Sequence, residues 1–187
     1  MSDIRPDTRT AILEAGFQVF NARPGASLGD VADHAGVGRA TLHRHFASRE
    51  TLLKALALTA IDELNAAVET VVADATSYSQ ALRLALDAIV PLGERQAFLV
   101  SEAVQRDPEV ADAYARDMEE LRVSIEAARS EGLFAADLPV EWIAQSYNAL
   151  IYAAWEMIRD GHATHRQAAD LAWRTFTNGL RGERNDG

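Results

Sequence analysis

The sequence predicts an all-α fold, and three features of the 187-residue chain support this prediction. Apolar residues recur with the spacing of amphipathic helices along most of the chain. No segment shows the alternation of apolar and polar residues that is typical of a half-buried strand. Proline and glycine separate the helix-period segments at Pro91, Pro108, Gly132, Pro139 and Gly161.

The first helix is predicted from about Pro6 to Asn21. Pro6 stands near the first turn, where the N–H that proline lacks would have no partner within the helix. The segment "ARPGAS" then ends the helix. Its buried stripe is expected to consist of Ile12, Leu13, Phe17 and Phe20.

Two short helices are expected next. Ser27 followed by Asp30 resembles a capping box and begins a helix over "LGDVADHA". Gly36 ends it, because a tight turn needs a residue that tolerates positive φ. The second helix is predicted from about Arg39 to His45, with Leu42 and Phe46 as its buried anchors. Two short helices joined by a glycine-containing turn form a helix-turn-helix.

A longer helical region follows. Ser48 is a suitable N-cap for a helix over about 49–73. Further helices are predicted near 77–90, 94–105, 108–130, 140–159 and 165–180. We therefore expect two domains, a head over 1–48 and a body over 49–187, with the 49–73 helix connecting them.

Charge is distributed unevenly between these two parts. Residues 1–55 contain seven Arg or Lys against six Asp or Glu, although the whole chain has a net charge of −10. An acidic body with a locally basic head is expected if only the head approaches phosphates. The overall charge argues against indiscriminate binding of nucleic acid or membrane.

Several other classes of protein are disfavoured. There is no apolar stretch of membrane-spanning length and no secretory leader. The absence of cysteine excludes disulfides and thiolate chemistry and agrees with a cytoplasmic location. The familiar nucleophile and nucleotide-binding motifs are also missing, so we expect no catalytic residue and no cofactor. His43 and His45 point to different sides of a helix, which disfavours a metal site.

The short helix that begins at Arg39 carries residue types that contact DNA. Arg39, Ala40 and Thr41 lie on its first turn, where an inserted helix meets the base edges, and arginine binds guanine bidentately. The alternative is that the three helices only pack together and the arginines form a solvated face. The other residues expected to contact DNA are Ser27, His43, Arg44, His45, Arg49, Lys54 and Arg5.

The order of residues in the head resembles that of the TetR (tetracycline-repressor-like) family of bacterial transcriptional regulators. The matching string is "VADHAGVGRATLHRHFASRETLLKAL", preceded by "TRTAILEAGFQVF". It covers roughly the first 55 residues. Three positions depart from the family pattern: Gly38 replaces a hydroxyl residue, His43 a tyrosine and Arg49 a lysine.

The segment "WIAQSYNALIYAAWEMI" is apolar almost all round, so a helix there must be covered on two sides. With the last helix it resembles the pair that forms a four-helix dimer interface in the family, although packing within one chain is the alternative. The expected interface residues are Ile151, Ala154, Ile158, Ala168, Leu171, Ala172 and Thr175.

In the family, the body encloses a mostly apolar ligand pocket. The aromatic and apolar residues of this body suit such a pocket, although any one of them is as readily explained as core. The expected ligand-binding residues are Phe98, Tyr114, Met118, Leu121, Trp142, Tyr147 and Trp155.

The resemblance implies that 1–48 form the DNA-binding domain and 49–187 the ligand-binding and dimerisation domain. It also implies a homodimeric repressor that binds a palindromic, double-stranded DNA operator and releases it when a partly apolar small molecule binds. Two recognition helices on one dimer bind half-sites about one helical turn apart. A helical enzyme or ligand carrier, and a DNA-binding protein without ligand control, are the alternatives.

Overall fold

The computed structural model describes residues 7–101, 104 and 106–180, and every regular element within them is helical, which confirms the all-α prediction. Most helices begin and end within two residues of their predicted positions. The elements are α1 Thr8–Ala22, α2 Leu28–His34, α3 Arg39–His45, α4 Arg49–Val72, α5 Tyr78–Ile89, the 3-10 helix η1 Val90–Leu92, α6 Gly93–Leu99, α8 Pro108–Ser130, α9 Val140–Arg159 and α10 His165–Gly179.

The predicted helix over 94–105 is the exception, because α6 ends at Leu99. The chain turns at Ser101, whose N–H donates to the carbonyl oxygen of Phe98 at 3.2 Å. This turn allows both Leu99 and Val104 to enter the same core. In a continuous helix, side chains five residues apart would point in different directions.

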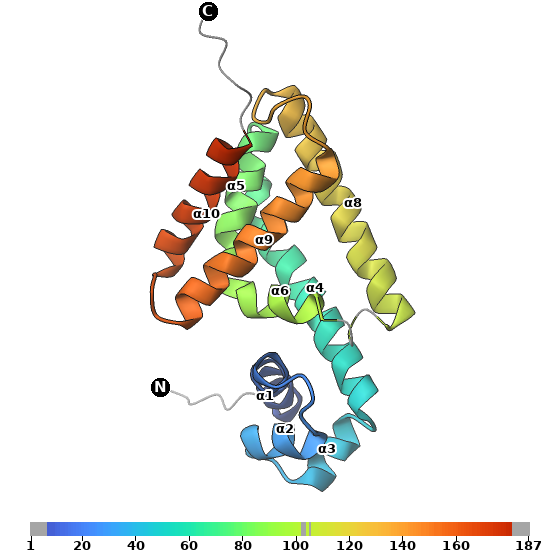
Figure 1. Ribbon diagram of the computed structural model, residues 1–187. Helices are drawn as coiled ribbons and strands as arrows, with labels where there is room; N and C mark the ends of the chain where they lie inside the picture. Colours follow the sequence, from blue (N-terminus) through green and yellow to red (C-terminus); the bar gives the residue numbers. More distant parts are fainter. Residues whose placement is uncertain (1–6, 102–103, 105, 181–187) are drawn as a thin grey trace, which may run out of the picture.

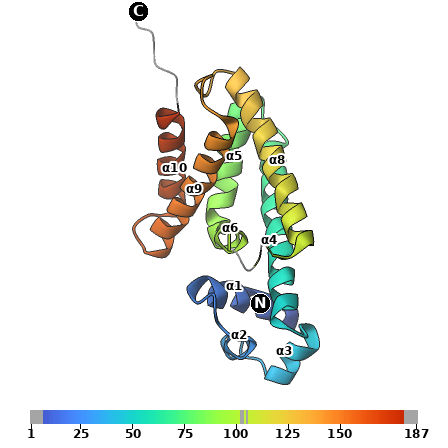
Figure 2. The same ribbon diagram turned by 45° about the vertical axis from the view of Figure 1, so that its right-hand side comes forward.

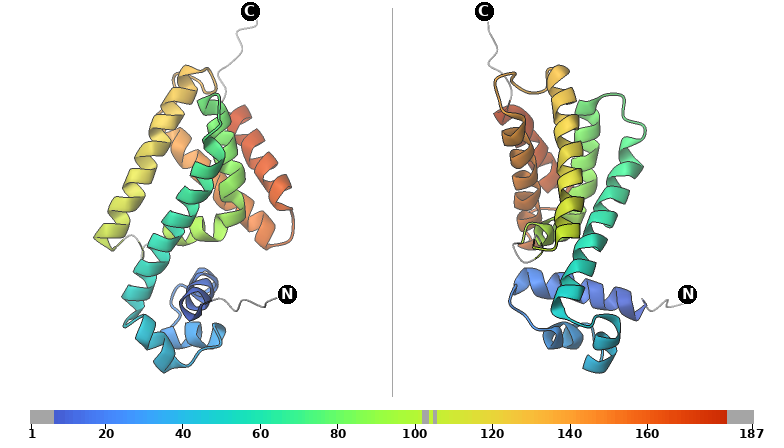
Figure 3. Two further views of the ribbon diagram at one scale, coloured as in Figure 1. Left: turned by 180° about the vertical axis from the view of Figure 1, so that it is seen from behind. Right: turned by 90° about the vertical axis from the view of Figure 1, so that its right-hand side faces the viewer.

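The helices form a small head below a larger body (Figure 1). Helices α1 to α3 make up the head, and α4 runs from the head into the body, where α5, α8, α9 and α10 stand beside one another. Helix α6 lies at the lower end of the body, facing α1, as Figures 2 and 3 also show.

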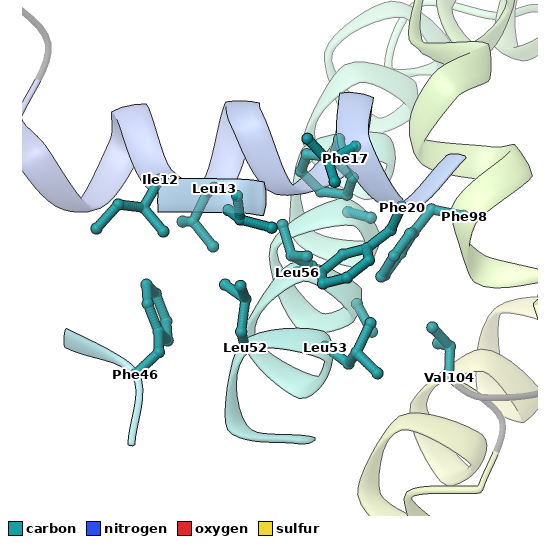
Figure 4. Packing of buried hydrophobic residues seen from close by; sticks show 14 of the residues in the cluster. Ile12, Leu13, Phe17, Phe20, Phe46, Leu52, Leu53, Leu56, Phe98 and Val104 are labelled. Atoms are coloured by element: carbon teal, nitrogen blue, oxygen red, sulfur yellow. The ribbon is translucent and has the colours of Figure 1, made fainter. Parts of the chain in front are cut away.

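A buried cluster continues from the head into the body. Figure 4 shows Ile12 and Phe17 of α1 facing Leu52 and Leu56 of α4, with Phe98 of α6 in the same cluster. Gly16 permits this close approach, since a Cβ there would lie 2.9 Å from Leu56 Cδ1. The hydrophobic core of the head is therefore completed by α4 and α6.

A second buried cluster stabilises the upper body. It contains Tyr147 and Ile151 of α9 together with Phe176 of α10. The rings of Tyr147 and Phe176 meet edge to face with their centroids 5.2 Å apart, which is a favourable aromatic geometry.

No helix among residues 7–101, 104 and 106–180 combines the length and the apolar character that crossing a membrane requires.

Candidate nucleic-acid interface and ligand cavity

The helix-turn-helix is built from local signals that the sequence carries. The capping box at the start of α2 is present: Ser27 Oγ accepts a hydrogen bond from the N–H of Asp30, and the Asp30 carboxylate accepts one from the N–H of Ser27. Gly36 has a φ of 67° in the turn, which a side chain would strain. Leu42 and Phe46 are buried and hold α3 against the head.

Helix α3 presents its first turn to solvent. Arg39 and Ala40 are exposed and Thr41 is half-buried. The Arg39 guanidinium lies along Gly29 of α2, where an added Cβ would be 3.2 Å from Arg39 Nη2. The guanidinium of Arg44 donates to Thr41 Oγ1 at 3.1 Å. The residues that the sequence places at the base edges are therefore at least partly accessible at the start of α3.

The lower part of α3 is also accessible. His43, Arg44 and His45 are exposed, so their side chains are available to a backbone phosphate beside the helix. Gly38 is the N-cap of α3 and provides no side-chain hydrogen bond there. A Cβ at this position would meet no atom within 4 Å, so a larger residue fits.

The Arg49 side chain forms its hydrogen bonds within the protein. Its Nε donates to the carbonyl oxygen of Ala26 at 3.3 Å, and Nη2 donates to that of Pro24. The guanidinium also lies over the Phe20 ring, 5.0 Å from the centroid. Arg49 thus fastens the loop between α1 and α2 to the first turn of α4, a use that the sequence prediction of a phosphate contact did not foresee.

Lys54 is likewise directed toward the body. Its Nζ lies 2.5 Å from an Oε of Glu109 and 3.4 Å from an Oδ of Asp107, both at the start of α8. These carboxylates raise the pKa of Lys54, the hydrogen bond to Glu109 contributing most. The hydroxyl of Ser27 is occupied by the capping box, and Arg5 lies outside the described residues.

The body contains a cavity of about 620 Å³ between α4, α5, α8 and α9. This volume is in the range of sites for drug-sized ligands. Four of the seven residues expected to bind a ligand line it, namely Tyr114, Met118, Leu121 and Tyr147. Its other apolar walls come from α4 and α5, which the sequence did not single out; they include Leu64, Val68, Ala81 and Ala85.

The other three residues expected to bind a ligand lie elsewhere. Phe98 packs edge to face on Phe17 of the head, with ring centroids 5.3 Å apart. Trp142 is 59% exposed. Trp155 packs so closely on Gly93 that a Cβ at that glycine would lie 2.5 Å from the Trp155 Cβ. Aromatic composition alone did not distinguish core, cavity and surface.

Several polar groups in the cavity wall are hydrogen-bonded within the protein. The amide of Asn148 donates to Met118 Sδ at 3.3 Å, and the amide of Gln96 donates to Asn148 Oδ1 at 3.4 Å. The hydroxyl of Tyr147 donates to the carbonyl oxygen of Leu82 at 2.8 Å. Burial raises the pKa of Tyr147, so the phenol stays protonated.

The predicted dimer residues require a correction. Ile151, Ala154, Ala168 and Ala172 are buried within their own chain, where they pack between α9 and α10 and against the body. Ile158 is half-buried, and only Leu171 and Thr175 are exposed.

The helices α9 and α10 have a second apolar face that points outward. Four of the seven large exposed hydrophobic side chains among the described residues lie on these two helices: Trp142, Tyr152, Met157 and Leu171. Because α9 is apolar on both sides, the sequence did not show which side faces its own body.

A helix-turn-helix with an accessible second helix, joined by one long helix to an α-helical body, defines a DNA-binding regulator. Residues 12–56 match the family described as bacterial regulatory proteins, tetR family. The HTH-type transcriptional repressor LfrR of Mycolicibacterium smegmatis is 36% identical over 182 residues, covering 96% of this chain and 93% of the relative. The chain belongs to the TetR family of transcriptional regulators.

Solved structures agree with this assignment. The crystal structure of the TetR-like regulator LfrR from Mycobacterium smegmatis in complex with proflavine has a TM-score of 0.73 at 32% identity, covering 94% of this chain and 98% of that one. The ketosteroid transcriptional regulator KstR2 of Mycobacterium tuberculosis has a TM-score of 0.79 at 20% identity, covering 96% and 97%, and shares the fold.

Proposed function

We propose that this protein is a homodimeric repressor that binds a palindromic DNA operator through α3 and releases it when a small molecule fills the body cavity. The observation that carries the proposal is the accessible first turn of α3, where Arg39 and Ala40 are exposed and Thr41 is half-buried. Arg39 reads a guanine in the major groove, while His43, Arg44 and His45 donate to phosphates. In this proposal residues 1–48 form the DNA-binding domain, although α4 completes its core.

The path from effector to DNA runs along α4. Leu64, Asn65 and Val68 of this helix line the cavity, and Leu52 and Leu56 of the same helix pack against α1. A ligand that favours a different position of α4 therefore changes the separation of the two recognition helices. A coupling free energy of about 1–3 kcal/mol lowers operator affinity by about 5- to 150-fold. The LfrR complex with proflavine supports a small-molecule effector.

We assign the dimer interface to the outward face of α9 and α10. Tyr152, Met157 and Leu171 are each at least 38% exposed in the single chain. Exposed large apolar side chains on neighbouring helices are typical of an interface between subunits. Two copies joined there present both recognition helices to one DNA duplex, which binding to a palindrome requires.

A gel-shift experiment on the DNA that flanks the protein's own gene tests the proposal. The wild-type protein is expected to bind one fragment, and Arg39→Ala is expected to weaken binding by about 1–3 kcal/mol and to relax the preference at one base pair. Arg166→Ala, which removes the same charge from the exposed start of α10, is the matched control and should bind normally. Equal binding by both variants would argue against α3 as the reading helix.

A further inference from the structure

The charged residues that line the body cavity are all acidic. Glu69, Asp117, Glu120 and Glu131 contribute carboxylates, and no Lys, Arg or His is found among the described residues of its wall. An anionic ligand would therefore meet several negative charges and no positive one. The charge of the wall favours a cation.

In three of these four carboxylates the negative charge is already stabilised by water or by backbone hydrogen bonds. Glu69 and Glu120 are exposed, so water stabilises their charge. Glu131 is exposed too and accepts hydrogen bonds at 2.9 Å from the N–H groups of Tyr78 and Ser79 at the start of α5. These bonds hold the pKa of Glu131 below its usual value.

Asp117 is different, because its carboxylate is half-buried in the cavity wall and forms no ion pair with any described residue. Oδ1 accepts one hydrogen bond, from the Asn65 amide at 3.2 Å. Burial raises the pKa of Asp117, and the negative charges of Glu120 and Asp62 add to this effect. The hydrogen bond from Asn65 and the charge of Arg116 oppose it without reversing it. A carboxylate in such a place is short of a positive partner.

The cavity that Asp117 lines also has aromatic and apolar walls. Tyr114 lies near Asp117 on α8, and its pKa is raised by burial and then by the Asp117 charge. Met118, Tyr147 and Val68 line the same cavity of about 620 Å³. Aromatic faces and a desolvated carboxylate together bind organic cations more strongly than neutral molecules of the same shape.

We propose that the effector is an organic cation with an apolar body, and that Asp117 is the residue that binds its positive charge. This inference rests on the proposed function, because it names the chemical class of the effector for the same cavity. The free-energy cost of desolvating the Asp117 carboxylate is offset when a cation binds beside it. Asp117 therefore distinguishes charged from neutral ligands, while the apolar walls accept a range of shapes.

Two ligands of nearly the same shape test the inference. Acridine is uncharged at mildly alkaline pH, and N-methylacridinium is a permanent cation on the same ring system. Titration calorimetry on the full-length protein is expected to give a Kd about ten- to hundredfold lower for N-methylacridinium, because its permanent charge attracts the half-buried Asp117 carboxylate even without a hydrogen bond.

The variant Asp117→Asn is expected to remove this difference while leaving acridine binding unchanged, and the unchanged acridine binding also shows that the variant is folded. Asp112→Asn is the matched control, since it removes an exposed carboxylate of the same helix that does not line the cavity, and should change either Kd by less than about twofold. The inference is overturned if wild-type protein binds acridine as tightly as N-methylacridinium, if it binds neither, or if Asp117→Asn retains the preference.

Operator release, measured separately, distinguishes this inference from the proposed function. A neutral or anionic compound that binds the cavity and releases the operator would overturn the cation assignment and leave the proposed function intact. Tight binding of N-methylacridinium through Asp117 without any release of DNA would uphold the cation site and contradict the proposed function.

Discussion

The guanidinium of Arg95 on α6 lies over the ring of Phe17 on α1, with its carbon 4.2 Å from the ring centroid. The same guanidinium pairs with Glu14 of α1 and, at 2.8 Å, with Glu63 of α4. One side chain of the body thus joins the head and the connecting helix. Arg95 is only 11% exposed, and burial alone would lower its pKa, but the two carboxylates reverse this effect and raise it.

Replacing Arg95 with alanine is expected to lower the free energy of unfolding by about 2 kcal/mol, because the variant loses the stacking on Phe17 and leaves Glu14 and Glu63 without their cation. The concentration of effector that releases the operator should also change, since α6 no longer holds α1 through this side chain. Urea unfolding and operator release measure the two effects. Arg122→Ala, which breaks an exposed pair with Glu119, should change stability by less than about 1 kcal/mol, and an equal loss in both variants would contradict this role of Arg95.

Arg49→Ala distinguishes an internal role from a phosphate contact. Because the guanidinium is bound to the carbonyl oxygens of Pro24 and Ala26, the variant is expected to lose about 1–2 kcal/mol of stability. The slope of log affinity for the operator against log salt concentration should stay the same. A slope reduced by about one unit would show that Arg49 binds a phosphate instead.

The dimer assignment predicts that Tyr152→Glu converts the protein to a monomer. A carboxylate on the outward face of α9 would have to be buried without a partner in the dimer, which costs several kcal/mol. Sedimentation equilibrium gives the molecular mass. Val123→Glu is the matched control, because Val123 is an exposed hydrophobic residue of α8 outside this face, and it should remain dimeric.

Asp117→Asn should also change how stability depends on pH. The folded state raises the pKa of Asp117, chiefly through burial, so ionisation disfavours folding. Stability from this residue is lost as pH rises from its ordinary value near 3.8 through the raised pKa. The variant is therefore expected to be more stable than wild type at neutral pH, by urea unfolding, with no difference at a pH below both values.

Asp160→Asn is expected to change stability at neutral pH in the opposite direction to Asp117→Asn. The Arg159 side chain donates a hydrogen bond to Asp160 at 2.9 Å and holds its pKa below the usual value. Stability from Asp160 is present at neutral pH and is lost as pH falls through the lowered pKa. Replacing Asp160 should thus slightly lower stability at neutral pH, as measured by urea unfolding. If Asp160→Asn instead gained stability as Asp117→Asn does, the gain at Asp117 could not be attributed to burial of its carboxylate.

The sequence by itself determined the helices and the helix-turn-helix, because their signals act between near neighbours in the chain. The capping box of Ser27 and Asp30 needs only a three-residue separation, and Gly36 needs only its own backbone angle. The accessible turn of α3 follows from the same short-range pattern, since Leu42 and Phe46 fix which side of a short helix is buried.

Only the tertiary structure decided what the long side chains and the two-sided helices do. Arg49 and Lys54 pair with groups 23 or more residues away in sequence, and α9 offers two apolar faces of which packing selects one. The cavity likewise depends on how α4 and α5 approach α8 and α9. Such contacts depend on the packing of the whole molecule, which residue spacing along the chain does not encode.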